Sequence, residues 1–217
     1  MNASVTRILL TCGVVAGPIY IVVGLIEILI RPGFDPTRHD LSLMSNGDLG
    51  WIHIALLITT GLLTIAGAIG IRRALESGRG VKWGPLLLGL YGLGLIGAGI
   101  FVADPMNGFP PGTPAGTPTT ISGHGLLHFV SGAVGFLGLI AACFVFARRF
   151  NSLKQPGWAN FSVATGVLYF AAFFGITAGS SQGGAVLTFV ILAFTVAVIL
   201  GWAWVSSISA LVRKEIG

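Results

Sequence analysis

Six long apolar stretches, separated by segments that are polar, basic or rich in glycine and proline, constrain this chain more than any other feature of its sequence. Crossing about 30 Å of hydrocarbon as a helix takes about 20 residues at about 1.5 Å per residue. The composition fits a chain surrounded by lipid, with 54% hydrophobic and 9% charged residues. The sequence therefore predicts an all-α, polytopic membrane protein with a single domain over residues 1–217. We place the spans near residues 8–30, 51–71, 83–103, 123–147, 159–178 and 184–208.

Lysine and arginine are distributed unevenly between the two sides of this predicted membrane domain. Ten of the twelve lie on one side, and only Arg31 and Arg38 lie on the other. Because short basic loops stay in the cytoplasm, we expect both termini to be cytoplasmic and the first, third and fifth loops to face outward. The chain would then lie in the cell (cytoplasmic) membrane as three helical hairpins. The net charge of +5 follows from this topology and does not indicate nucleic-acid binding, so the expected partners are membrane lipids.

Glycine and tryptophan have recognisable positions in this pattern. Glycines are concentrated in the third and fourth spans, and in lipid such small residues let helix backbones approach closely. We therefore expect these two spans to pack tightly, with a glycine-hinged gate as the alternative. The five tryptophans lie near predicted span ends, which is typical of interfacial anchors. They are Trp51, Trp83, Trp158, Trp202 and Trp204.

Most of the titratable side chains fall on the outer side of the predicted membrane domain. All four histidines and five of the seven acids lie in outer loops or at the outer ends of spans. Since titratable groups are costly in a bilayer and tend to mark function, this one-sided grouping indicates a polar site at the outer leaflet. The residues are His39, His53, His124, His128, Glu27, Asp35, Asp40, Asp48 and Asp104.

The strongest pattern within this group is a pair of histidines at the start of the fourth span. His124 and His128 are four residues apart, so their imidazoles share one helix face and can bind one metal ion. Asp104, at the end of the third span, is the expected further ligand. A nitrogen and oxygen ligand set without thiolate suits zinc, with Asp40 or His53 as the base that activates a bound water. The alternatives are that the histidines anchor the helix by hydrogen bonds to loop carbonyls and headgroups, or that they bind haem.

Two charged residues of the first hairpin have a structural and a functional interpretation. Glu27 lies one turn before Arg31, which predicts an ion pair between them, with a proton-relay or ligand role as the alternative. Arg38 is expected to pair with Asp40 or Asp104, or to hold a lipid phosphate.

The first outer loop also brings a hydroxyl close to a base and an acid in sequence. Ser42 follows His39 and Asp40, the residue types of a hydrolytic triad. Neighbours in sequence point in different directions, however, and a triad is defined by geometry. We therefore expect Asp40 or Ser42 to cap a short helix at the membrane interface.

Three motifs carry a resemblance to a known family. They are RPGFDPTRHDLSLMSNGDLGW after the first span, ADPMNGFPPG after the third and HGLLH at the start of the fourth. In these motifs the chain resembles the uncharacterised prokaryotic membrane proteins grouped as domain of unknown function 998. The resemblance covers nearly the whole chain and implies six spans, but no activity.

A looser likeness is to the membrane hydrolases that include alkaline ceramidases and the adiponectin receptors. It rests on residue types alone, namely His124, His128, His53, Asp104 and Ser42. This chain departs from that pattern in having six spans rather than seven and in carrying its histidine pair on the fourth span rather than the last.

The predicted function is that of a multi-pass membrane protein with a His/Asp site at the outer leaflet. That site would bind a lipid-like substrate or hydrolyse it with a metal. A small transporter or lipid carrier and a non-catalytic assembly protein are the alternatives, so the sequence leaves open whether the protein is an enzyme.

Overall fold

The computed structural model describes residues 3–216, which form six long helices and one short 3-10 helix, without a named strand. Each of the six long helices is long and apolar enough to cross a membrane, which confirms the predicted all-α class and the number of spans. The elements are α1 (Ala3–Ile30), η1 (Leu41–Ser45), α2 (Gly50–Ala74), α3 (Trp83–Ile100), α4 (Gly123–Ser152), α5 (Pro156–Gly179) and α6 (Gly184–Glu215).

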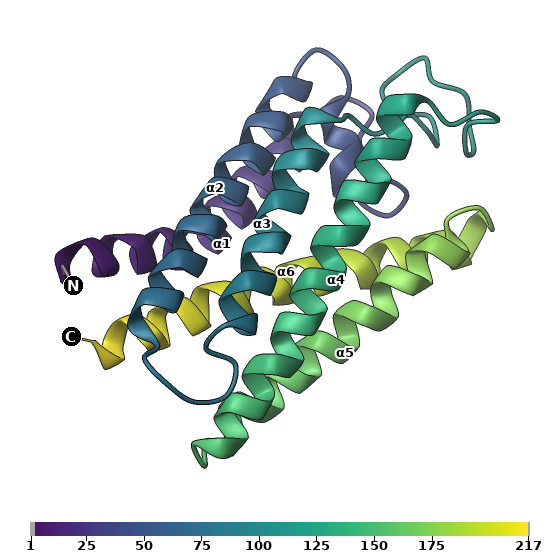
Figure 1. The fold of residues 1–217 in the computed structure, drawn as a ribbon. Helices are drawn as coiled ribbons and strands as arrows, with labels where there is room; N and C mark the ends of the chain where they lie inside the picture. The colour runs from purple at the N-terminus through teal and green to yellow at the C-terminus, as the bar shows by residue number, and fades with distance from the viewer. Residues whose placement is uncertain (1–2, 217) are drawn as a thin grey trace.

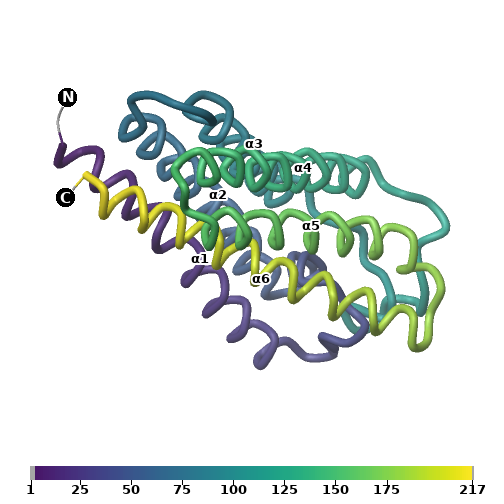
Figure 2. The backbone as a smooth tube through the Cα atoms, turned by 90° about the horizontal axis from the view of Figure 1, so that it is seen from below, coloured from purple at the N-terminus to yellow at the C-terminus, as the bar shows by residue number. Residues whose placement is uncertain are grey.

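The six helices form a closed ring in sequence order. Each long helix packs against the one before it and the one after it, and α6 returns to pack against α1 (Figures 1 and 2). The contacts between α2 and α3 are as extensive as those between α1 and α2, so the packing does not divide these helices into separate pairs. Both termini lie at one end of the ring, together with the α2–α3 and α4–α5 connections, and the other three connections lie at the opposite end (Figure 1).

Glycines permit the closest helix contacts. A Cβ atom added to Gly94 of α3 would lie 2.5 Å from the Cα of Gly135 in α4, so neither position tolerates a side chain without movement. Gly13 and Gly67 bring α1 and α2 equally close, with 2.7 Å between an added Cβ at Gly67 and the Cα of Gly13. The tight packing predicted for the third and fourth spans is therefore found between α3 and α4, and it extends to the first pair of helices.

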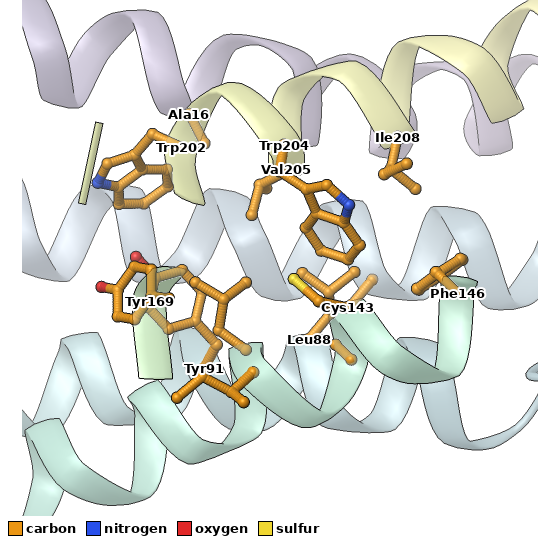
Figure 3. Packing of buried hydrophobic residues seen from close by; sticks show 14 of the residues in the cluster. Ala16, Leu88, Tyr91, Cys143, Phe146, Tyr169, Trp202, Trp204, Val205 and Ile208 are labelled. Atoms are coloured by element: carbon orange, nitrogen blue, oxygen red, sulfur yellow. The ribbon is translucent and has the colours of Figure 1, made fainter. Parts of the chain in front are cut away.

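The tryptophans divide into an exposed and a buried group, and Trp158 is half-buried between them, with its ring 6.1 Å from that of Phe150. Trp51 and Trp83 are 65% and 59% exposed, as interfacial anchors are. Trp202 and Trp204 are fully buried, so their assignment as anchors was wrong (Figure 3). The helical register explains the difference, because both indoles of α6 point into the ring and the Trp204 indole N–H donates to the Ser162 hydroxyl at 2.9 Å. In addition, α6 continues to Glu215, seven residues beyond the predicted span, so Trp202 lies near the middle of the helix rather than near its end.

Candidate functional site

The ring of helices encloses a cavity of about 510 Å³ in the half that lies opposite the chain termini. Side chains from η1 and from every long helix contribute to its lining, most of them apolar. Ile121 and Phe129 line the cavity and are 71% and 53% exposed, so the cavity reaches the surface near the start of α4. A largely apolar cavity with a few polar groups is the usual form of a small-molecule site.

The deep end of the cavity is aromatic. Four buried side chains, each near the middle of its helix, form what we call the aromatic floor, and three of them are labelled in Figure 3. The rings of Tyr20 and Trp202 stack with centroids 4.9 Å apart, and Tyr91 lies 5.6 Å from Trp202. Within the described residues, the indole N–H of Trp202 has no hydrogen-bond partner. The aromatic floor consists of Tyr20, Tyr91, Tyr169 and Trp202.

Four polar residues of the lining, at the end of the cavity opposite the chain termini, form what we call the cavity mouth. They are Asp40, Ser42, Asp104 and His128, and Thr117, Thr177 and Ser180 also belong to the lining. Asp40 caps η1, because its Oδ1 accepts from the Leu43 amide at 3.3 Å. The same oxygen accepts from the Ser42 hydroxyl at 2.6 Å. The predicted cap of a short helix is thus confirmed at Asp40, and Ser42 supports it.

Asp104 connects the end of α3 to the start of α4. It lies four residues beyond Ile100, the last residue of α3, so the predicted span was too long at this end. The residue after α3, Phe101, already has an extended backbone conformation, and Pro105 disfavours helical conformation at Asp104. Asp104 Oδ2 accepts from the Ser122 amide at 2.9 Å, and a Cβ at Gly125 would collide with this carboxylate. The carboxylate therefore occupies the N-terminus of α4, where negative charge is favourable.

The predicted zinc ligands are not gathered around a common point. His128 turns its Nδ1 toward the carbonyls of Ala98, at 3.0 Å, and Phe101, at 2.8 Å. His124 is exposed, and its ring contacts Phe101 with centroids 5.8 Å apart. No three histidine, cysteine or acidic side chains within residues 3–216 are grouped as a metal site requires. In their present arrangement these residues do not fit a zinc site, so zinc binding stays a prediction. The contacts of His128 are those of a polar anchor.

Glu27 and His53 form a buried pair between α1 and α2. His53 Nδ1 lies 2.8 Å from Glu27 Oε2, and both side chains are at most 1% exposed. The other polar atoms of the pair, Glu27 Oε1 and His53 Nε2, are buried without a hydrogen-bond partner in the described chain. His53 also contacts Tyr20 of the aromatic floor edge-on at 6.2 Å. The pair therefore lies directly behind the cavity, although neither residue lines it.

Arg31 does not form the ion pair with Glu27 that the sequence indicated. Its guanidinium donates instead to the backbone carbonyls of Met44 and Asn46, which close the loop around η1. Burial lowers the pKa of Arg31 from its ordinary value. A guanidinium suits these carbonyl contacts because it has five N–H donors. Arg38 is exposed and takes part in no ion pair within residues 3–216.

Two loops are joined above the cavity, at the end of the ring opposite the chain termini; we keep the name outer loops for them from the predicted topology. His39 is buried, its Nδ1 accepts from the Asp35 amide at 2.9 Å, and its Nε2 donates to the Asn107 carbonyl at 3.0 Å. Asn46 donates to the Ala103 carbonyl at 3.1 Å, which makes a second bridge between the loops. Hydrogen bonds from the Thr37 hydroxyl and amide hold the pKa of Asp35 below its ordinary value. These contacts make the loops of residues 31–49 and 101–122 one connected outer layer.

The sequence interpretation missed the aromatic floor. The available signal was that Tyr20, Tyr91 and Tyr169 lie in mid-span, where an amphipathic ring finds no headgroup layer. Such a residue needs a polar neighbour or a cavity inside the protein. Of the predicted site residues, the structure brings Asp40, Ser42, Asp104 and His128 to one cavity and leaves Glu27, Arg38, His53 and His124 outside its lining.

Six apolar helices closed around an internal cavity define the chain as a multi-pass helical membrane protein. Residues 14–211 match the family described as Protein of unknown function (DUF998). The chain therefore belongs to this family, as its loop motifs indicated. Comparisons with curated proteins and with solved structures give no match.

Proposed function

We propose that this protein binds an amphiphile, with the apolar part of the ligand inside the ring of helices and its polar head at the cavity mouth. The observation that carries the proposal is the cavity of about 510 Å³, since most of its lining is apolar and its few polar groups lie at the ends. Pockets of about 300–1,000 Å³ with this distribution are typical of small-molecule sites. We further propose that the protein lies in the cell membrane with its termini in the cytoplasm.

The connected outer layer supports this proposal. The bonds of Arg31, His39 and Asn46 fix the loops that carry Asp40 and Asp104, so the mouth groups are held in place before a ligand arrives. A pre-organised site loses less entropy on binding than a mobile one. Access near Ile121 and Phe129 suits a ligand that arrives from the outer leaflet.

A photoreactive probe tests the proposal directly. Wild-type protein in neutral lipid nanodiscs is labelled with dodecanol that carries a diazirine in its chain, and the labelled peptides are mapped. We expect saturable labelling of cavity-lining segments in α4, α5 and α6. Labelling confined to lipid-facing residues, or labelling that does not saturate, would overturn the proposal.

Gly132 offers a way to fill the cavity. It lines the cavity, and an added Cβ would meet only Phe136, at 3.7 Å, so the larger side chain of Gly132→Leu fits the backbone and occupies ligand space. We expect this variant to lose the saturable labelling. Gly175→Leu is the matched control, because Gly175 does not line the cavity and an added Cβ there meets nothing within 4 Å.

The buried Glu27–His53 pair favours a second candidate function, proton-coupled carriage of the same ligand. An ionisable pair inside a membrane domain and in contact with a ligand cavity through Tyr20 is a recurrent feature of proton relays. In proteoliposomes, this function predicts ligand movement that depends on a pH gradient in wild type and not in Glu27→Gln. Binding without such movement would leave the protein a ligand-binding protein rather than a carrier.

A further inference from the structure

The charge of the cavity lining indicates which amphiphile the site would take, provided that the proposed function holds. Two carboxylates, Asp40 and Asp104, belong to the lining, and no lysine or arginine does. The two arginines of the outer loops are directed elsewhere, because Arg31 binds the carbonyls of Met44 and Asn46 and Arg38 is exposed. A negatively charged head would therefore meet like charge without a compensating cation.

Each carboxylate keeps one oxygen available. The Oδ1 of Asp40 is used by Ser42 and the Leu43 amide, and the Oδ2 of Asp104 is used by the Ser122 amide. Throughout the described chain, no hydrogen bond reaches the Oδ2 of Asp40 or the Oδ1 of Asp104. Both residues are half-buried, so a charge-assisted hydrogen bond at these oxygens would be less weakened by water than one on the surface.

The aromatic floor gives an independent indication that the cavity receives a ligand. Trp202 is fully buried, lines the cavity and has an indole N–H without a hydrogen-bond partner in the described chain, at the deep end of the same space. Leaving such a donor unpaired is unfavourable, so an occupant that supplies an acceptor would relieve it. Figure 3 shows Trp202 beside Tyr169 in the buried cluster.

We infer that the ligand is an amphiphilic amine or quaternary ammonium, with its positive head between Asp40 and Asp104 and a mainly apolar body whose inner end carries an acceptor for the Trp202 indole N–H. Opposite charge at the mouth would favour this class over a neutral alcohol, and like charge would disfavour an anionic phosphate of the same chain length. The inference rests on the proposed function and adds the charge of the ligand to it.

Competition among three probes of equal chain length tests the charge. Dodecyltrimethylammonium, dodecanol and dodecyl phosphate, each below its micelle concentration, compete with the diazirine dodecanol for wild-type protein in neutral nanodiscs. We expect dodecyltrimethylammonium to compete at the lowest concentration and dodecyl phosphate at the highest. Equal competition by all three, or strongest competition by dodecyl phosphate, would overturn the inference.

Two isosteric variants locate the effect. Asp40→Asn and Asp104→Asn keep an oxygen for the Leu43 and Ser122 amides but remove the charge, so each should weaken competition by dodecyltrimethylammonium about tenfold relative to competition by dodecanol. Asp48→Asn is the control, because Asp48 is an exposed outer carboxylate outside the lining. An equal loss in the control would contradict the site. Saturable labelling without charge preference would refute only this inference, whereas no saturable labelling would refute the proposed function as well.

Discussion

Glu27 and His53 are the clearest case of buried polar side chains that must find their partners within the protein. Their shared contact at 2.8 Å is inaccessible to water, so each side chain compensates for the burial of the other. The sequence placed Glu27 near Arg31 because they are one turn apart, but α2 brings His53 closer in space. The spacing of residues within one helix predicts only partners on that helix, so it could not predict His53 of α2.

The pair predicts a characteristic pattern of stability. His53→Leu leaves the Glu27 carboxylate buried without its partner and should lower the free energy of unfolding by about 3 kcal/mol. The double variant Glu27→Leu/His53→Leu removes both polar groups and should recover most of that loss. Unfolding in detergent, followed by circular dichroism, measures each variant.

His124→Leu serves as the control for this experiment. His124 is exposed, so its replacement should change the free energy of unfolding by less than about 0.5 kcal/mol. Additive losses from the two single variants, with no recovery in the double variant, would show that Glu27 and His53 do not depend on each other.

Helix packing explains which glycines matter in α3. Gly94 and Gly89 lie on the same helix, but an added Cβ would reach the Gly135 backbone from Gly94 and nothing within 4 Å from Gly89. Gly94→Ala should therefore lower stability by about 1–3 kcal/mol through overpacking. Gly89→Ala should be neutral or stabilising by up to about 1 kcal/mol, because alanine favours helix. Thermal unfolding of the two variants side by side measures the difference, and equal effects would contradict the α3–α4 contact.

The helices themselves were largely predictable, and the site only in part. Hydropathy indicates each span because backbone groups in lipid must be satisfied within a helix, and this holds without knowledge of neighbouring helices. Asp104 lies four residues beyond the end of α3, so its place at this end of the helix was predicted to within a few residues. The inward rotation of Trp202 and the contact of His53 with Glu27 depend on helix–helix packing, which periodicity alone did not reveal in helices that are apolar all round.

The order of the six helices gives the whole molecule two chemically different ends. The end with the termini carries most of the basic residues, and there Arg149 donates to the carbonyls of Ser77 and Arg79 in the α2–α3 connection. The opposite end carries the cavity mouth and the connected outer layer. This polarity places the site at the outer leaflet if the basic end is cytoplasmic.

Reporter fusions test this orientation. Alkaline phosphatase inserted at Gly116, in the α3–α4 connection, should be active because that loop is expected outside. The same enzyme inserted at Arg79, in the α2–α3 connection, should be inactive. Activity with the reverse pattern would place the cavity mouth at the cytoplasmic face.

The most direct measurement of the central claim is the number of ligands that the protein retains. Native mass spectrometry of protein released from nanodiscs after equilibration with dodecyltrimethylammonium should show one bound molecule for wild type and for Gly175→Leu, and none for Gly132→Leu. Equal retention by all three proteins, or none by wild type, would contradict the account of an amphiphile held inside the ring of helices.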